Sequence, residues 1–382
     1  MRTVISLPMS ALPRPDRPLR VAFLYMKGRI ARLAEVERGA APTEFFYGAI
    51  EMAGGGHEVS HFEIDPSASG GFAERVIGRL WPASTRPVKM EPATIAQVWR
   101  LAGQLNRADC LVATGGNIAF ALAALARIGV IRKPIVGIQC GVLNFQHSAW
   151  RRRLSGALLR RMHTHLFGEA ELAPMCRFFD LPADVISVNL FGVDTNFWRP
   201  DSATTRDIIL AIGNDGRRDF DTLVAAAKDI AAPVHIVTKL PLSEPLPPNV
   251  THHRGSWHGT ELSDERIRGL YQRACVVVVP LRQSNQPSGQ SVTLQAMACG
   301  CPVVLTETEG LWSREQIVDG GNVVLVPPGD GAKLASAVNQ LLSDSPTAER
   351  LAQAGREATV RCGNIDAFAK RVAAACAQLS AH

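Results

Sequence analysis

The chain has 382 residues, of which 46% are hydrophobic and 20% charged, a composition typical of a globular protein and not of a disordered one. Its length suits two domains of ordinary size. Residues 1–200 carry 24 Lys and Arg against 16 Asp and Glu, a net charge of +8, whereas the remainder carries 17 against 19, or −2, which together give the formal +6. We therefore expect a partner with negative charge at the N-terminal half.

Three features of the sequence bear on where the protein resides. No run of about 18 uncharged apolar residues occurs, so we expect no transmembrane helix. Residues 1–20 are rich in proline and arginine and lack an apolar core, which is typical of a loose lead-in and not of a signal peptide. The eight cysteines form no Cys-x-x-Cys pair, which favours reduced thiols over a disulfide framework or a zinc site. We predict a cytoplasmic protein, either free or attached peripherally to the inner face of the membrane.

Strands and helices alternate from the start of the N-terminal half. Residues 20–25 predict a buried strand, 43–53 a helix that three glycines end, and 57–63 a second strand. Loops that follow strand ends form the ligand crevice of open α/β sheets, so the loop 27–42 is a candidate substrate loop. A solvated connector is the alternative for this loop.

A glycine pair follows another predicted strand of this half. Gly115 and Gly116 come directly after the apolar stretch 111–113 and precede a predicted helix. Their position at a strand end makes Gly115 and Gly116 candidates for contact with a substrate, although a tight turn alone also explains such a pair.

A cluster of arginines marks a predicted helix between 149 and 161. Trp150 and three leucines accompany the basic residues, which are Arg151, Arg152, Arg153, Arg160 and Arg161. A basic amphipathic helix with an aromatic residue is attracted to an anionic membrane surface, so we predict a peripheral membrane contact here. A solvated helix face is the alternative, and the lack of a known binding module argues against nucleic acid.

The C-terminal half alternates strands and helices with short connections, which predicts a doubly wound parallel sheet with a ligand crevice at the strand ends. The predicted strands are 208–212, 233–238, 250–253, 275–279 and 303–305, and the predicted helices include 219–231 and 263–273.

The stretch 287–305 reads as a loop, a helix and a strand. Ser288 is suited to cap a helix that spans 291–299, Gly300 to end it, and Pro302 to prevent its continuation. The N-terminus of a helix presents unpaired backbone N–H groups and a positive dipole end. This predicts an anion site, for which phosphate is the commonest biological ligand.

The residues from Gln295 to Val304, Gln-Ala-Met-Ala-Cys-Gly-Cys-Pro-Val-Val, resemble the Glu-Ala-Met-Ala-x-Gly-x-Pro-Val-Val signature of the retaining glycosyltransferases of family 4 (group 1). The resemblance extends over the C-terminal half, in the family's order, through the segments 191–200, 209–213, 316–320 and 325–330. It implies the α/β fold class called GT-B, with two Rossmann-like doubly wound parallel-sheet domains facing a central cleft. An acceptor domain would span 1–199 and a donor domain 200–382, with the last helix packing back on the first domain.

The resemblance also implies which residues bind the sugar donor. Gly213 would let the backbone approach a diphosphate, and Arg218, or Arg217 beside it, would replace a family lysine that grips phosphate. As the catalytic residue, Arg218 would stabilise the leaving diphosphate. Asn214 occupies a position where the family has an arginine. The remaining candidates for donor binding are Lys239, Gly289, Gln290, Ser291, Gln295 and Glu315.

Two departures from the family concern its most informative positions. The family has two glutamates eight positions apart, where this chain has Pro287 and Gln295. Gln295 would retain a ribose contact without the charge, and proline cannot contact the transferred sugar. The resemblance implies transfer from a UDP- or GDP-linked sugar to a glycolipid, polysaccharide or small molecule, with retention and without a metal cofactor. A non-catalytic nucleotide-sugar-binding subunit, or a nucleotide-sugar epimerase of the same fold, is the alternative.

Overall fold

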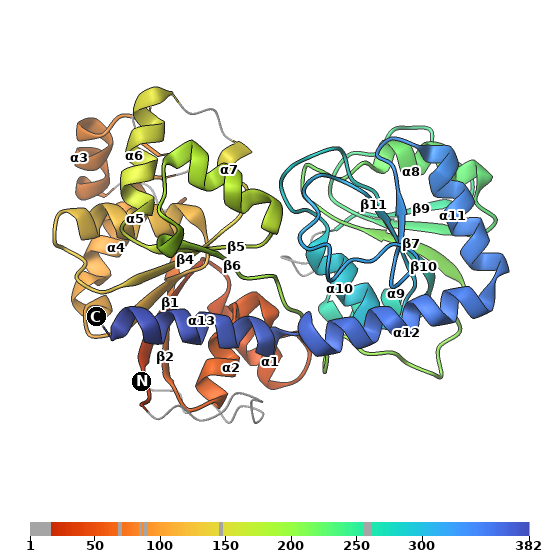
Figure 1. Cartoon of the computed structure of the whole chain (residues 1–382), viewed down its shortest axis with the longest axis horizontal. Coiled ribbons are helices and arrows are strands. Elements are labelled where there is room, and N and C mark those ends of the chain that lie inside the picture. The colour runs from red at the N-terminus through yellow and green to blue at the C-terminus, as the bar shows by residue number, and fades with distance from the viewer. Residues whose placement is uncertain are drawn as a thin grey trace. The chain divides into compact units, whose positions relative to one another are not determined.

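The computed structural model describes residues 17–67, 71–83, 86–87, 90–144, 148–255 and 262–381. The chain forms two compact units (Figure 1). Unit 1 contains the residues up to Glu37, Phe45–Leu190 and Asp366–His382, and unit 2 contains Arg38–Glu44 and Phe191–Ile365. The sequence analysis placed one boundary between residues 199 and 200. In the structure, a short N-terminal segment (Arg38–Glu44) belongs to unit 2, and the last helix belongs to unit 1.

Unit 1 is built on a six-stranded sheet in the order β2-β1-β3-β4-β5-β6, in which every neighbouring pair is parallel. Its central strands are buried along most or all of their length, because helices cover both faces of a parallel sheet. The strands are β1 (Arg20–Met26), β2 (Glu58–Ile64), β3 (Cys110–Ala113), β4 (Ile135–Gln139), β5 (His163–Leu166) and β6 (Ile186–Val188).

The helices of unit 1 lie on both sides of this sheet. Figure 1 shows α4, α5 and α6 on one side and α2 and α13 on the other. The helices are α1 (Leu33–Glu37), α2 (Ala49–Gly54), α3 (Phe72–Leu80), α4 (Pro92–Leu105), α5 (Gly116–Arg127), α6 (Ala149–Leu159), α7 (Glu169–Phe179) and α13 (Ile365–Ser380), with 3-10 turns at Ile30–Arg32, Glu44–Phe46, Val142–Asn144 and Ala183–Val185.

The last helix, α13, belongs to the core of unit 1. Phe368, Val372 and Cys376 are fully buried on it. The Asn189 amide donates to the Phe368 carbonyl, and the Arg371 guanidinium donates to the Asn189 side-chain oxygen at 2.6 Å. These contacts hold α13 against the segment that follows β6.

Unit 2 has a second six-stranded parallel sheet, in the order β12-β11-β10-β7-β8-β9. The doubly wound parallel sheets predicted for both halves are therefore confirmed. The elements are β7 (Ile208–Ile212), α8 (Phe220–Ala226), a 3-10 turn (Ala227–Asp229), β8 (Val234–Val237), β9 (Val250–His253), α9 (Asp264–Arg273), β10 (Ala274–Val279), α10 (Gln290–Ala298), β11 (Val303–Thr306), β12 (Val324–Val326), α11 (Gly331–Ser343) and α12 (Ser345–Cys362).

Helix α10 begins and ends one residue earlier than the sequence predicts, with Gly289 and Cys299 as its caps. Gly289, with φ of +76°, is its N-cap and supplies no side chain, so the first backbone N–H groups have no side-chain cap. Ser288 is not the cap, because its hydroxyl donates to Asp215 Oδ1 at 2.8 Å. Gly300, with φ of +69°, follows the last turn, where a left-handed conformation suits glycine. In the described part of the chain, no helix is long and apolar enough to cross a membrane.

Candidate functional site

Arg218 lies at the centre of the candidate site, in the loop between β7 and α8. Its side chain is only 3% exposed. The backbone of the loop is joined to the segment after β10, because Asp219 N donates to Pro280 O at 3.0 Å and Arg282 N donates to Arg217 O at 2.8 Å. Since β7 and β10 are neighbours in a parallel sheet, their carboxyl ends bring these two loops together.

Two glycines make room for the Arg218 guanidinium. A Cβ atom added to Gly213 would lie 2.0 Å from Arg218 Nε, so any side chain there would displace the arginine. A Cβ atom added to Gly289 would lie 3.2 Å from Arg218 Nη1 and 2.6 Å from Val279 Cγ1. The guanidinium therefore lies between the end of β7 and the start of α10, and three residues proposed from sequence, Gly213, Arg218 and Gly289, come together.

The buried guanidinium is poorly compensated by the protein. Asp215 is its ion-pair partner, with 2.9 Å between Arg218 Nε and Asp215 Oδ2, but the two groups are not aligned for a hydrogen bond. Among the described residues, neither Nε nor Nη1 has a hydrogen-bond partner in suitable geometry. Burial lowers the pKa of Arg218, and Asp215 opposes that shift. A buried cation with unused hydrogen-bond donors is costly, so it marks a place where an anion would bind.

The start of α10 adds further donors beside Arg218. The Gln290 side chain is buried, and its Nε2 has no hydrogen-bond partner. Ser291 is half-buried in the first turn. With no side-chain cap, the backbone N–H groups of this turn and the helix dipole can act on a bound anion. Arg218 and α10 thus supply charge and directed donors from two neighbouring loops.

Asn214 and Lys239 are linked to each other next to this site. Asn214 Oδ1 accepts hydrogen bonds from Lys239 N at 2.7 Å and from Thr238 Oγ1 at 3.2 Å, which joins the ends of β7 and β8. Asn214 Nδ2 is buried without a partner. Lys239 itself is exposed, and Arg217 is half-buried. Asn214 therefore shapes the loop and retains one amide hydrogen-bond donor, Nδ2, for a ligand.

Gln295, the residue predicted to contact ribose, is hydrogen-bonded to two buried side chains. It is 6% exposed, its Nε2 donates to Glu44 Oε1 at 3.0 Å, and its Oε1 accepts from the Tyr271 hydroxyl at 3.2 Å. Both polar atoms of the amide are thus bonded inside unit 2. The Gln295 oxygen already receives a hydrogen bond from a buried tyrosine, and its contact with ribose stays a prediction.

Glu44 is a buried carboxyl that the sequence analysis missed. Besides Gln295, it accepts hydrogen bonds from Trp198 Nε1 at 2.7 Å and from Asp194 N at 2.9 Å. Burial, and then the charge of Asp194, raises the pKa of Glu44 to about 8, although these hydrogen bonds oppose the shift. No local motif around Glu44 could have indicated that its carboxyl is buried and hydrogen-bonded, since its partners lie between 150 and 251 positions further along the chain.

Glu315, the last candidate for donor binding, is exposed and forms no hydrogen bond or ion pair with the described residues. No hydrogen bond or ion pair among the described residues therefore links Glu315 to Arg218 or to α10. Within the described ranges, no three His, Cys, Asp or Glu side chains come together as metal ligands would.

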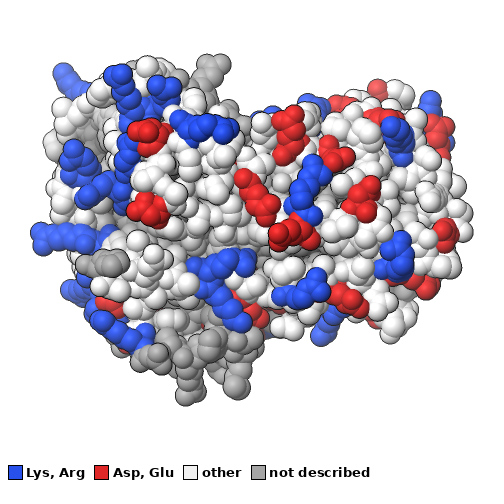
Figure 2. Space-filling view, viewed as in Figure 1, with Lys and Arg blue, Asp and Glu red and all other residues white. Residues whose placement is uncertain are grey.

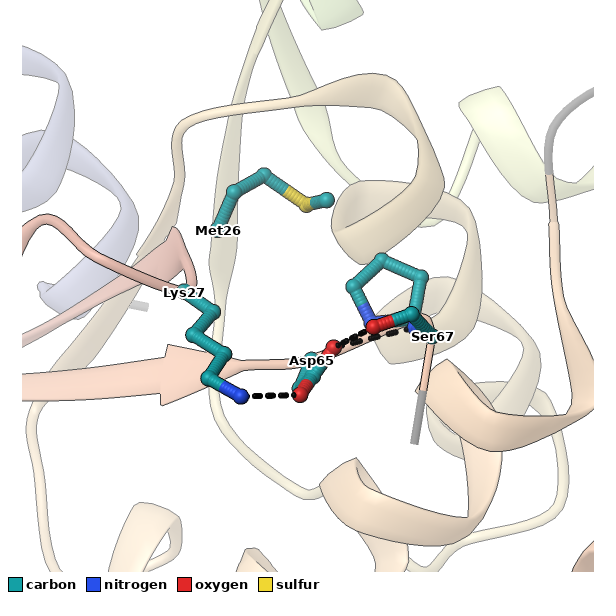
Figure 3. Close-up of a pocket in the computed structure, with 5 residues that line it drawn as sticks. Met26, Lys27, Asp65 and Ser67 are labelled. Atoms are coloured by element: carbon teal, nitrogen blue, oxygen red, sulfur yellow. Dashed lines mark hydrogen bonds and ion pairs between the residues drawn. The ribbon is translucent and has the colours of Figure 1, made fainter. Parts of the chain in front are cut away.

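A pocket lies at the strand ends of unit 1. It has a volume of about 570 Å³ and is lined by Met26, Lys27, Asp65, Pro66 and Ser67. Figure 3 shows the Lys27 and Asp65 side chains pointing toward each other, and 2.8 Å separates Lys27 Nζ from Asp65 Oδ2. The bonds from Lys27 and Ser67 hold the pKa of Asp65 at about 2. Of the predicted substrate loop 27–42, Lys27, its first residue, is the one described residue that lines this pocket.

The predicted glycine pair lies near this pocket. Gly115 is the N-cap of α5, and Gly116 is its first residue. The next residue, Asn117, donates from Nδ2 to the sulfur of Met26 at 3.1 Å. The start of α5 therefore lies beside one residue of the pocket wall.

The family match falls in the unit that contains Arg218. Residues 206–344 match the family model described as Glycosyl transferases group 1. This match lies within unit 2. Alpha-maltose-1-phosphate synthase of Mycobacterium tuberculosis is 28% identical over 212 residues, which cover 47% of this chain and 54% of that protein. D-inositol 3-phosphate glycosyltransferase of Corynebacterium diphtheriae is 39% identical over 93 residues, which cover 24% of this chain and 21% of that protein. The chain thus spans about half the length, or less, of these curated relatives.

Solved structures of glycosyltransferases match the fold over nearly the whole chain. Sucrose-phosphate synthase from Thermosynechococcus elongatus has a TM-score of 0.68 at 18% identity, covering 96% of this chain and 100% of that one. HepE of Anabaena, solved in complex with UDP-glucose, has a TM-score of 0.67 at 17% identity, covering 94% and 100%. At such identities these likenesses show the fold, and the predicted GT-B fold class is confirmed.

Proposed function

We propose that the chain is a glycosyltransferase and that its sugar donor is a nucleotide diphosphate sugar. The observation that carries the proposal is the buried Arg218 guanidinium beside the uncapped start of α10, where Nε and Nη1 have no hydrogen-bond partner among the residues that the structure describes. Together they would bind the diphosphate of the donor. The absence of side chains at Gly213 and Gly289 leaves the space that the guanidinium occupies. The match of residues 206–344 to the glycosyl transferases group 1 family supports this assignment.

The chemistry follows from where charge develops. When the bond from the sugar to the diphosphate breaks, the leaving diphosphate gains negative charge. Arg218 and the N–H groups of α10 are fixed next to that position and stabilise the charge without reorganising. Because these groups supply the positive charge, we propose a reaction that needs no metal cofactor. As for the glycosyltransferases of family 4 that the sequence resembles, we propose that the sugar keeps its anomeric configuration.

The pocket at Met26, Lys27 and Asp65 is the proposed acceptor side, with Gly115 and Gly116 at the start of the neighbouring helix. The carboxylate, ammonium and hydroxyl groups of this pocket suit a ligand rich in hydroxyl groups. A glycolipid, a polysaccharide or a small hydroxylated molecule satisfies that chemistry. Because HepE was solved with UDP-glucose, we propose UDP-linked sugars as the first donors to test.

A second candidate is a subunit that binds a nucleotide sugar without transferring it. Two observations favour it. Pro287 stands where the family signature has a glutamate, and Gln295, in place of the second glutamate, is bonded to Glu44 and Tyr271 instead of facing a ligand. The anion site at Arg218 would serve this candidate equally well.

Calorimetric titration separates the candidates when it is followed by an assay of nucleotide release. UDP, GDP and their sugars are titrated into the full chain, and each sugar that binds is then incubated with mixed acceptors while released nucleotide is measured. Binding with acceptor-dependent release is the result expected of a glycosyltransferase. Binding without release favours the second candidate, and no binding of any diphosphate would refute both.

A further inference from the structure

Helix α3 presents an apolar stripe to the solvent. Phe72 is 77% exposed, Val76 38% and Leu80 79%. These residues are four positions apart, so they share one face of the helix. The neighbouring face, about 100° further round the helix from Val76, packs on the core of unit 1 through Ile77, and Trp81, just after the helix, packs there as well. The exposed stripe is therefore additional to the face that packs on the core, and the described residues leave most of Phe72 and Leu80 uncovered.

Arginines flank the apolar stripe. Arg75 and Arg79 are exposed on the same helix, three and seven positions after Phe72, which places them along one edge of the stripe. The Arg100 guanidinium lies at the start of α3, since a Cβ atom added to Gly71 would be 3.0 Å from it. Figure 2 shows Lys and Arg side chains gathered over the part of unit 1 where Figure 1 places α3 and α6.

Helix α6 continues this surface. The Arg151 guanidinium donates to the Ala83 carbonyl just after α3, and the neighbouring Trp150 is 60% exposed. Arg152 and Arg153 are also exposed. Arg160, at the far end of the helix, is paired with Asp180 at 2.7 Å. Of the arginines singled out in the sequence, Arg151 is thus the one bonded to the segment after α3, whereas the Arg152 guanidinium lies 5.7 Å from the Phe178 ring centroid.

We propose that this α3–α6 face, made of Phe72, Arg75, Val76, Arg79, Leu80 and Trp150, binds the surface of an anionic phospholipid bilayer. An apolar stripe edged by arginines matches the boundary between acyl chains and anionic headgroups. There Phe72 and Leu80 leave water, and the guanidinium groups contact phosphate. A second copy of the chain fits this face less well, because a two-fold contact would bring the same arginines against each other.

Flotation of the full chain with lipid vesicles tests the proposal. The vesicles contain either phosphatidylcholine alone or phosphatidylcholine with about one third phosphatidylglycerol. The unchanged protein should float with the anionic vesicles and not with the neutral ones, and less protein should float at about 0.5 M salt than at about 0.05 M. Equal binding to both vesicles, or no binding to either, would overturn the proposal.

Paired variants distinguish the apolar from the charged contribution. The double change Phe72→Ser with Leu80→Ser should lower partitioning at least about tenfold, and Arg75→Gln with Arg79→Gln about fivefold for each charge. Ile128→Ser, at an exposed apolar residue elsewhere in unit 1, and Arg107→Gln are the matched controls and should leave partitioning unchanged.

UDP binding, which is proposed for unit 2, is measured on every variant to show that the protein is folded. The same measurement separates a failure of the lipid proposal from a failure of the proposed donor binding. If the α3 variants float as the controls do, the face does not bind lipid. If they instead abolish a dimer seen by analytical ultracentrifugation while no variant floats, the stripe is a self-association surface and the proposal is wrong.

Discussion

Replacing Arg218 by Met should weaken UDP binding while leaving the unliganded protein at least as stable. Each charge-assisted hydrogen bond to a ligand contributes about 1.5–3 kcal/mol, so loss of one such bond lowers affinity about 10- to 150-fold. Methionine fills much of the same volume without a charge, and the buried guanidinium has only Asp215 to compensate its desolvation. Removing such a charge costs the fold little or stabilises it. The melting temperature without ligand should therefore stay constant or rise.

The glycine beside the arginine provides an independent route to the same result. Gly213→Ala would place a Cβ atom 2.0 Å from Arg218 Nε and force the guanidinium out of its position, although the arginine remains in the chain. Gly216→Ala is the matched control, because a Cβ atom at Gly216 of the same loop would meet nothing within 4 Å. We expect weaker UDP binding for Gly213→Ala and unchanged binding for Gly216→Ala.

A double-mutant cycle measured by calorimetry decides whether the two changes act on one group. If Gly213→Ala acts by displacing Arg218, the combination with Arg218→Met should bind UDP no more weakly than the weaker single variant. Losses of binding free energy that simply add would show two separate effects. Wild-type affinity in Gly213→Ala would refute the idea that the position of this guanidinium determines diphosphate binding.

Three further outcomes follow from unit 2. Gln295→Glu, which restores a family glutamate, should lower the free energy of unfolding by about 2–4 kcal/mol, because it buries a second acidic group against the Glu44 carboxyl; adding Glu44→Gln should restore most of this loss in urea denaturation. Because the pKa of Glu44 is about 8 in the folded protein against 4.5 ordinarily, stability should fall as pH rises from about 4.5 to about 8, and Glu44→Gln should flatten that profile in thermal unfolding. Gly192→Ala should destabilise by about 2–4 kcal/mol, since its Cβ would lie 2.2 Å from the Asn364 carbonyl, whereas Gly103→Ala, with open space around it, should not; equal melting temperatures would contradict the steric argument.

The parts of the candidate site that sequence predicted are those encoded by local chain geometry. Gly213 and Arg218 follow one strand, and Gly289 precedes the helix after another. The ends of neighbouring parallel strands meet at one edge of a sheet, so a correct prediction of the elements also brings these residues together. The N-cap of α10 was wrong by one residue, because Ser288 has a better partner in Asp215, which belongs to a different loop.

The surroundings of Gln295 could not be predicted in this way. Its partner Glu44 is 251 positions away and lies on a short segment that leaves unit 1 to join unit 2. So short a segment has no periodic pattern in the sequence that would indicate which unit it joins. The exposed stripe of α3 was missed for a related reason, since apolar residues at helical spacing predict a buried face, and only the packing of Ile77 shows which face is the buried one.

The place of α13 has a consequence for synthesis on the ribosome. Unit 1 is interrupted after Leu190 and resumes at Asp366, so 365 − 190 = 175 residues of unit 2 are translated before its last helix exists. At ordinary translation rates this takes on the order of 10–35 s, during which Asn189 lacks the Phe368 and Arg371 groups that it binds in the finished protein. The second unit can therefore fold first, although its sequence comes later. The nascent first unit would meanwhile keep apolar surface open to chaperones until α13 leaves the exit tunnel.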